Sequence, residues 1–195
     1  MFYRFILFMA RIIFAYRPVR TKGRENLPAG AAVLCPNHRA ALDPVYLARA
    51  VGRRRSIAFL GKSEVMNGRF LTWFFKSLGV VPIRRGANDI GAMKGSLAVL
   101  KSGGYLGVFP QGTRVATEED TDAKAGAALL AARTSAPMVP VYIDGSDKPF
   151  GVVRVTFGKP IPVSAMDRRS DSGDGYRLVA QRLMEEIRLL KGKAV

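Results

Sequence analysis

The single histidine of the chain lies in a short segment with the residue types of acid–base catalysis. His38 is followed five residues later by Asp43, within the segment PNHRAALDP at residues 36–44. That spacing does not align two side chains on a helix, but a loop between a strand and a helix can fold the carboxylate back onto the imidazole. The carboxylate then orients one ring nitrogen, and the other can accept a proton from a hydroxyl. Asp43 and Pro44 are the expected N-cap and first residue of a helix. The alternative is that His38 only completes a turn and Asp43 only caps that helix.

A second segment, FPQGTR at residues 109–114, has the residue types of a phosphate site. A turn at Gly112 lets backbone N–H groups approach a ligand, and the guanidinium of Arg114 can grip phosphate oxygens in a fork. The alternative is an ordinary turn with a solvated arginine. The sequence contains no G-x-x-x-x-G-K-[ST] segment, which excludes a nucleotide-binding P-loop.

Both segments follow apolar runs that the pattern predicts to be strands. Predicted strands lie at residues 31–35, 56–60, 79–83, 105–109, 138–143 and 152–157, and predicted helices at 44–50, 69–77, 89–101, 122–134 and 175–191. Asn88 and Gly103 are the expected N-cap and stop of the third helix. The alternation predicts one three-layer α/β/α domain with a mostly parallel or mixed central sheet. Active sites gather at the carboxyl ends of such strands, where the pattern would place His38, Lys62, Arg84 or Arg85, and Arg114.

The N-terminal residues 1–16 are almost wholly apolar, but Arg4 and Arg11 interrupt them. The segment is too short to span a bilayer and is a poor signal peptide. As a helix it places both arginines on one face, which is typical of a helix that lies in the membrane interface. The alternative is a helix docked on the core of the protein itself.

A second amphipathic segment, RFLTWFFKSL at residues 69–78, is either core-facing or interfacial. With the N-terminus it could form a platform on a membrane. The expected membrane contacts are Phe2, Phe5, Phe8, Phe70, Trp73, Phe74 and Phe75. We therefore expect a membrane-interface helix at residues 1–17 and one folded domain at residues 18–195.

The charge balance restricts the partners. The chain has 31 Lys and Arg against 15 Asp and Glu, a formal net charge of +16, which favours anionic membranes, nucleic acids or phosphorylated substrates. The basic residues are scattered and no nucleic-acid-binding motif is present, so no nucleic acid is expected as a partner. One Cys excludes an intrachain disulfide, and with one His it makes the usual zinc site nearly impossible, so no metal is expected.

In order along the chain, these segments resemble the glycerolipid acyltransferases with an H-x4-D motif, specifically the 1-acyl-sn-glycerol-3-phosphate acyltransferases. The matching segments are Asn37-His38-x4-Asp43, Lys62-Ser63-Glu64, residues 79–85, residues 109–114, Lys124-Ala125-Gly126 and residues 137–141. Two positions depart from the usual pattern of the family. Gln111 stands where glutamate is usual, and Arg84 stands where aspartate is frequent.

The resemblance implies transfer of a fatty acyl group from acyl-CoA or acyl carrier protein to the sn-2 hydroxyl of lysophosphatidic acid, which gives phosphatidic acid. His38 would be the general base and Asp43 its orienting partner. No acyl-enzyme is implied, and Cys35 is expected to be a small buried hydrophobe. The residues that would bind the glycerol phosphate are Arg114, Gly112, Thr113, Lys62, Arg84 and Arg85, with Asn37 and Gln111 in support.

The resemblance further implies that no cofactor is needed beyond the acyl donor. It implies a peripheral or monotopic protein on the cytoplasmic face of a membrane, such as a bacterial inner membrane. One alternative is the same chemistry on glycerol 3-phosphate, another lysophospholipid or an acyl-amino-acid lipid. The other alternative is a non-catalytic basic protein that binds anionic membranes or nucleic acid.

Overall fold

The computed structural model describes most of the chain: residues 17–52, 55–63, 68–69, 72–73, 79–83, 89–114, 123–148, 150–162 and 173–192. The strands are β1 (Val19–Lys22), β2 (Ala32–Pro36), β3 (Ile57–Lys62), β4 (Val80–Ile83), β5 (Tyr105–Gly107), β6 (Met138–Asp144) and β7 (Val153–Phe157). The helices are the short η1 (Arg24–Asn26) and α2 (Asp43–Val51), α4 (Ile90–Lys101), α5 (Gly126–Thr134) and α6 (Gly173–Lys191).

The strands form a single sheet in the order β1-β7-β6-β2-β5-β3-β4. Neighbouring strands are parallel except for β6 and β7, which pair antiparallel. Consequently five strands end on the same side of the sheet, with their carboxyl ends together: β6, β2, β5, β3 and β4. The loops that follow these strands lie together at those carboxyl ends. The predicted fold class, an α/β domain around a mostly parallel or mixed sheet, is confirmed.

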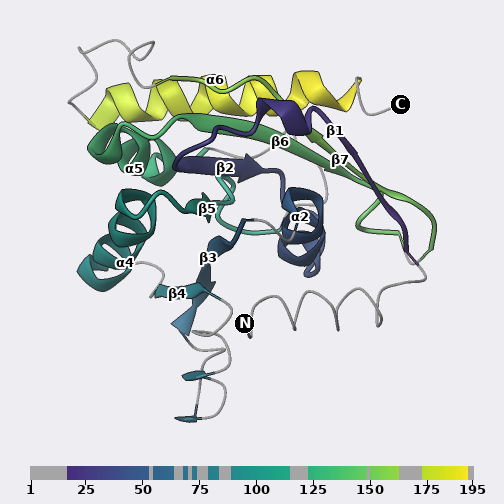
Figure 1. The fold of residues 1–195 in the computed structure, drawn as a ribbon. Helices are drawn as coiled ribbons and strands as arrows, with labels where there is room; N and C mark the ends of the chain where they lie inside the picture. The colour runs from purple at the N-terminus through teal and green to yellow at the C-terminus, as the bar shows by residue number, and fades with distance from the viewer. Residues whose placement is uncertain are drawn as a thin grey trace.

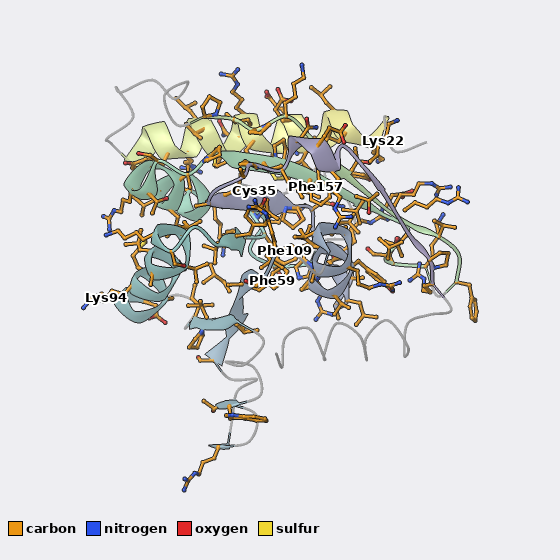
Figure 2. All side chains as sticks on the ribbon, in the orientation of Figure 1. Lys22, Cys35, Phe59, Lys94, Phe109 and Phe157 are labelled. Carbon is orange, nitrogen blue, oxygen red and sulfur yellow. The ribbon has the colours of Figure 1, made fainter. Side chains whose placement is uncertain are left out.

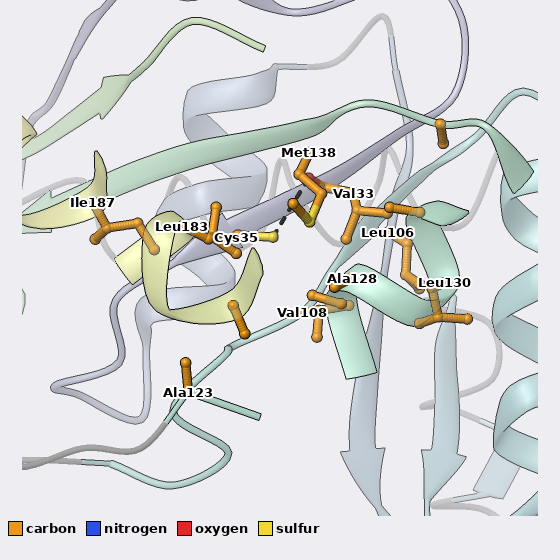
Figure 3. Packing of buried hydrophobic residues seen from close by; sticks show 14 of the residues in the cluster. Val33, Cys35, Leu106, Val108, Ala123, Ala128, Leu130, Met138, Leu183 and Ile187 are labelled. Atoms are coloured by element: carbon orange, nitrogen blue, oxygen red, sulfur yellow. Dashed lines mark hydrogen bonds between the residues drawn. The ribbon is translucent and has the colours of Figure 1, made fainter. Parts of the chain in front are cut away.

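Helices cover the two faces of the sheet unequally (Figure 1). One face packs against α4, α5 and α6, in a core that includes Val33, Leu106, Met138 and Leu183. Figure 3 shows α6 residues Leu183 and Ile187 packed near Cys35 in this layer. The other face packs against α2, where Tyr46 and Leu47 are fully buried. The result is the expected three-layer arrangement, with β2 in the middle and every residue of β2 buried.

Three details of the predicted elements are wrong. The sequence pattern missed β1, an edge strand in which Arg20, Thr21 and Lys22 are exposed, so that no run of buried residues marks it. The N-cap of α4 is Asp89 and not Asn88, because the Asp89 carboxylate accepts the N–H of Ala92 at 3.0 Å. Helix α5 begins at Gly126 and not near residue 122, because Lys124 donates its N–H to the carbonyl of Pro110 at 2.8 Å and is held against that turn.

Most of the expected membrane contacts lie outside the described residues, namely Phe2, Phe5, Phe8, Phe70, Phe74 and Phe75. Within the predicted helix 69–77 the structure describes three residues as helical, Arg69, Thr72 and Trp73. The indole of Trp73 is 55% exposed. Within the described part of the chain, none of the helices combines the length and apolar character that a bilayer span requires.

Candidate active site

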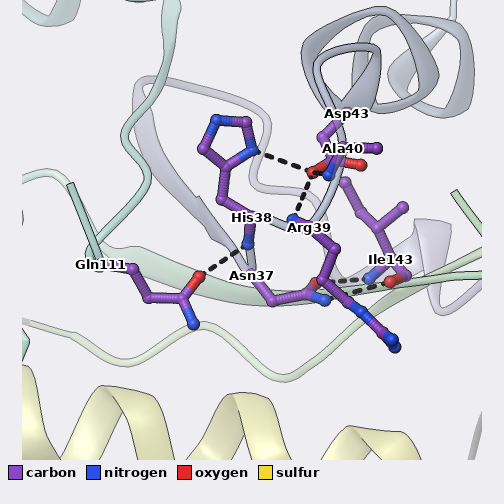
Figure 4. Close-up of polar contacts among 7 residues, drawn as sticks. All are labelled: Asn37, His38, Arg39, Ala40, Asp43, Gln111 and Ile143. Atoms are coloured by element: carbon purple, nitrogen blue, oxygen red, sulfur yellow. Dashed lines mark hydrogen bonds and ion pairs between the residues drawn. The ribbon is translucent and has the colours of Figure 1, made fainter. Parts of the chain in front are cut away.

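The structure brings His38 and Asp43 together at the carboxyl end of β2. His38 Nδ1 lies 2.9 Å from Asp43 Oδ2, and the two side chains are 15% and 0% exposed (Figure 4). The loop of residues 37–42 makes this contact possible because it turns the start of α2 back toward the end of the strand. His38 Nε2 points away from the carboxylate and has no hydrogen-bond partner among the described residues, so it faces whatever binds at this edge.

Asp43 organises the loop as well as the imidazole. Its Oδ2 atom also accepts the backbone N–H groups of Arg39 at 2.7 Å and Ala40 at 2.8 Å. The expectation that Asp43 caps α2 is wrong: Leu42 is the N-cap, and the carboxylate points back to the loop instead of forward to the helix amides. A buried carboxylate with three donors is fixed in place, so it holds the imidazole in one orientation.

Asn37 ties the site to the next strand of the sheet. Its side-chain oxygen accepts the N–H of Ile143 at 2.7 Å, and its side-chain nitrogen donates to the carbonyl of Ile143 at 3.0 Å (Figure 4). Asn37 is completely buried. The Asn37 side chain thus makes two hydrogen bonds to β6, in place of the backbone hydrogen bonds that end with β2. These bonds fix the point at which the His38 loop leaves the sheet.

We expect Asn37→Ala to destabilise the fold by about 2–4 kcal/mol, because two buried backbone groups of Ile143 lose their partners. Urea unfolding of both proteins measures the difference, and Asn37→Asp is the matched control that keeps one acceptor. A variant with unchanged stability would show that the loop is held by other contacts.

The segment at residues 109–114 lies directly beside His38. Gln111 is 2% exposed, and its Oε1 atom accepts the backbone N–H of His38 at 2.7 Å. The imidazole packs on the ring of Phe109 with 4.1 Å between centroids, and Phe109 in turn stacks on Phe59 at 6.4 Å. Figure 2 shows Phe59 and Phe109 near the middle of the molecule.

Gln111 therefore performs a task that needs only an oxygen acceptor. An amide supplies that acceptor as well as a carboxylate would, so the departure from the usual glutamate leaves the His38 backbone contact intact. The amide nitrogen, Nε2, is buried and has no partner among the described residues.

Gly112 of the same turn is half-buried and lies against the exposed Lys124. Gly112 has φ of 68°, and a Cβ at this position would lie 2.6 Å from Lys124 Cε and 2.8 Å from Lys124 Nζ. The lysine side chain thus lies across Gly112, in space that the Cβ of any other residue would occupy. The N–H of Gly112 donates to the carbonyl of Phe109 at 3.0 Å and is used within the turn. Thr113 and Arg114 follow and are exposed.

Sequence reasoning assigned no role to Lys124, although the segment Lys124-Ala125-Gly126 was among the family matches. The missing signal was spatial, because the contact joins two residues that are 12 positions apart in the chain. Lys124 makes no ion pair within the described part of the chain, and residues 109–114 contain no acidic side chain. Two cations, Arg114 and Lys124, therefore lie at the turn whose Gln111 contacts the backbone of His38.

Strand order ranks the other predicted cations by their distance from His38. Lys62 ends β3, two strands from β2, and Arg84 and Arg85 follow β4, three strands away. With about 4.8 Å between neighbouring strands, the ends of β3 and β4 are about 10 and 14 Å from the end of β2. Arg84, Arg85 and the side chain of Lys62 lie outside the described residues, so their roles stay predictions.

Cys35 is buried, as expected, and does not face the site. It is 0% exposed in the core beneath α6, and burial raises the pKa of its thiol far above the ordinary value. A thiol that stays protonated is a poor nucleophile. Among the described residues, no group of three His, Cys, Asp or Glu side chains could hold a metal ion.

Comparison with known proteins places this site in a family. The chain is 32% identical over 164 residues to the 1-acyl-sn-glycerol-3-phosphate acyltransferase of Streptococcus pneumoniae, which covers 81% of this chain and 60% of that protein. It is 30% identical to a chloroplastic enzyme of the same name from Arabidopsis thaliana, over 85% of this chain and 50% of that protein. The Bacillus subtilis protein of that name is 29% identical, with 82% of each chain covered.

The chain thus spans only about half to three fifths of the first two relatives. A solved structure, the 1-acyl-sn-glycerophosphate acyltransferase PlsC of Thermotoga maritima, has the same fold. Its TM-score is 0.72 at 23% identity, over 95% of this chain and 79% of that one.

The model of the family described as Acyltransferase matches residues 18–144. That range includes the His38–Asp43 pair, the turn at residues 109–114, Lys124 and the Ile143 backbone that binds Asn37. The resemblance seen in the motifs is therefore confirmed, and the chain belongs to the acyltransferase family.

Proposed function

We propose that this chain transfers a fatty acyl group from a thioester to the sn-2 hydroxyl of lysophosphatidic acid, which gives phosphatidic acid. The observation that carries the proposal is the His38–Asp43 pair, in which a fixed carboxylate holds one ring nitrogen at 2.9 Å and leaves the other open. Relatives that carry the name 1-acyl-sn-glycerol-3-phosphate acyltransferase support the choice of acceptor.

In this mechanism Nε2 of His38 removes the proton of the acceptor hydroxyl as its oxygen attacks the thioester carbonyl. The carbon–oxygen ester bond forms, the carbon–sulfur bond of the tetrahedral intermediate breaks, and the proton passes from the imidazolium to the departing thiolate. Asp43 stabilises the imidazolium while it exists. His38 reaches the hydroxyl directly, so no acyl-enzyme forms, in keeping with the buried position of Cys35.

Arg114 and Lys124 are the cations best placed for the phosphate of the acceptor. The sn-2 hydroxyl and the phosphate are separated by only two carbons and an oxygen, so the phosphate site must lie close to His38. The turn at residues 109–114 is on the strand next to β2, whereas Lys62, Arg84 and Arg85 follow strands farther away. We assign the N–H of Thr113 a supporting role in phosphate binding, and Gly112 the role of shaping the turn. Lys62, Arg84 and Arg85 would bind more distant parts of the acceptor phosphate or the anionic groups of the donor.

A largely apolar cavity elsewhere in the domain is the candidate site for the fatty acyl chain. Its volume is about 460 Å³, and it lies between the sheet and helices α4 and α5. The lining includes Leu60, Met93, Val108, Leu129 and Leu130. Val108 packs in the core on the α4, α5 and α6 side of the sheet, whereas Phe109 packs against the core on the α2 side, so an acyl chain in this cavity would reach His38 around the end of β5.

The donor is acyl-CoA or acyl carrier protein, and the reaction needs no cofactor besides it. We place the protein on the cytoplasmic face of a bacterial-type membrane, seated through residues 1–17 and the helix predicted at residues 69–77. The amphipathic sequence of these segments and the 55% exposure of Trp73 support this placement.

The test is thiol release by the purified chain in detergent, with a long-chain acyl thioester on either carrier. Lysophosphatidic acid is compared with monoacylglycerol, which lacks the phosphate, and with glycerol 3-phosphate, which lacks the acyl chain. We expect turnover with lysophosphatidic acid alone. Turnover only with another acceptor would assign the same chemistry to that acceptor, and no turnover with any would contradict the proposal.

Lys124→Met should raise the KM for lysophosphatidic acid about tenfold and leave kcat nearly unchanged. Methionine keeps the hydrocarbon that lies across Gly112 but removes the charge, and one charge-assisted bond to phosphate corresponds to about a tenfold change. Lys124→Arg should restore binding in part. The matched control is Lys94→Met, because Lys94 projects from α4 away from the site (Figure 2). An unchanged KM in Lys124→Met would remove this lysine from the phosphate site.

A further inference from the structure

The connection between β6 and β7 holds the most exposed large apolar side chain of the described residues. Phe150 is 77% exposed, more than Trp73, Ile90, Leu178 or Leu189. It precedes Gly151, which has φ of 97° and makes the tip turn sharply into β7. Covering this exposed phenylalanine with an apolar surface would be favourable, because it removes apolar area from water.

A buried arginine fixes the position of this tip. Arg17 is 3% exposed, and its guanidinium donates to the backbone carbonyls of Gly145, Ser146 at 3.4 Å and Gly151 at 3.4 Å. It also donates to the hydroxyl of Tyr46 on α2 at 3.1 Å. Both ends of the connection are thus bound to one side chain, so Phe150 projects from a fixed base.

Arg17 also marks where the apolar N-terminal sequence ends. Residues 1–16 directly precede it, and β1, which begins two residues later, pairs with β7 along the hairpin (Figure 1). The apolar residues 1–16 therefore join the described chain next to the hairpin. The carbonyl of Arg17 accepts a bond from Arg49 at 3.3 Å, which fixes this point to α2 as well.

The charges of the tip suit an anionic surface. Its two acidic residues are each paired with an arginine, Asp147 with Arg39 at 2.7 Å and Asp144 with Arg154 at 3.7 Å. Lys148, two residues before Phe150, is exposed and makes no ion pair among the described residues. An exposed aromatic ring beside an unpaired cation is the combination that inserts at the headgroup level of a bilayer.

The tip is also joined to the catalytic corner. Asn37, before His38, is bonded to Ile143 at the end of β6, and Arg39, after His38, is bonded to Asp147 in the connection. A surface that holds the tip would therefore lie next to the loop that carries His38.

We propose that the β6–β7 tip, with Phe150 as its inserted residue and Lys148 as its cation, docks on a bilayer containing anionic phospholipid. The docking presents the His38 corner to an acceptor held in that bilayer. The functional part of this inference rests on the proposed lipid acceptor, whereas the docking itself can be measured without turnover.

The test is binding of the full chain to vesicles of equal parts phosphatidylglycerol and phosphatidylcholine, measured by co-sedimentation. Phe150→Ser should lower the partition coefficient about tenfold, the value expected for removing one phenylalanine from an interface. Leu178→Ser is the matched control, because Leu178 is 66% exposed on α6 and should leave binding unchanged. Equal binding by the native chain and Phe150→Ser, or an equal loss in Leu178→Ser, would overturn the proposal.

A second readout locates the side chain itself. In a Trp73→Phe background, Phe150→Trp should give an indole emission that shifts to the blue with vesicles and is quenched by brominated acyl chains. Emission that stays unquenched would overturn the proposal. A blue shift caused by self-association in the absence of lipid would also overturn it, because the tip would then bind a second copy of the chain.

Activity separates this inference from the proposed reaction. Phe150→Ser should release thiol at the native rate when the acceptor is in detergent, and about tenfold more slowly when it is in vesicles. A native chain that binds vesicles through Phe150 yet turns over no acceptor would contradict the proposed reaction and leave the docking in place.

Discussion

His38→Ala should lower kcat for thiol release by about 10²–10⁴-fold, the usual contribution of a general base. The imidazole is the only group at the end of β2 that combines an open ring nitrogen with a fixed carboxylate behind it, 2.9 Å from the other nitrogen. Because the hydroxyl of the acceptor is a poor nucleophile until its proton is removed, loss of the base raises the barrier of the chemical step. KM should change little, since the proposed phosphate contacts are on another loop.

The fold of this variant should persist, because the backbone N–H of residue 38 still donates to Gln111 and Asp43 keeps two backbone donors. Circular dichroism and thermal unfolding check this point. Cys35→Ala is the matched control, since its thiol is buried under α6 and should be dispensable for turnover. Turnover retained in His38→Ala and lost in Cys35→Ala would replace direct attack by an acyl-enzyme route.

The sequence predicted the central part of the fold well because its strands are buried on both faces. Continuous apolar runs mark β2, β5 and β6, and each lies where the pattern placed it, with shifts of one or two residues at the ends. Strand β1 left no such mark. Its residues are exposed at the sheet edge, and what makes it a strand is pairing with β7, more than a hundred residues away. Local patterns do not contain that information.

The candidate site was predictable in its residue types and less so in its contacts. The pairing of His38 with Asp43 followed from the loop between a strand and a helix, whereas the cap assigned to Asp43 ignored the two loop amides that compete for the same oxygen. The acceptor role of Gln111 and the position of Lys124 across Gly112 depend on how β5 and α5 meet β2. Such contacts between distant segments are set by tertiary packing, which spacing along the chain does not encode.

Asp43→Asn should lower kcat by about 10²–10⁴-fold while the protein stays folded. The amide is nearly the same size, and its oxygen can replace Oδ2 as acceptor for the imidazole and for the N–H groups of Arg39 and Ala40. What is lost is the negative charge that stabilises the imidazolium formed when the hydroxyl gives up its proton. We expect the free energy of unfolding to change by only about 1–2 kcal/mol.

Asp43→Ala separates this electrostatic role from the structural one. Alanine leaves the N–H groups of Arg39 and Ala40 without their acceptor, so it should cost about 2–4 kcal/mol of stability in addition to the loss of kcat. Urea unfolding and single-turnover thiol release, measured on the same preparations, give both quantities. If Asp43→Asn kept native kcat, the carboxylate would serve only to shape the loop, and the imidazole would act without a charged partner. If Asp43→Asn lost as much stability as Asp43→Ala, its low kcat would report a disordered loop instead of a missing charge.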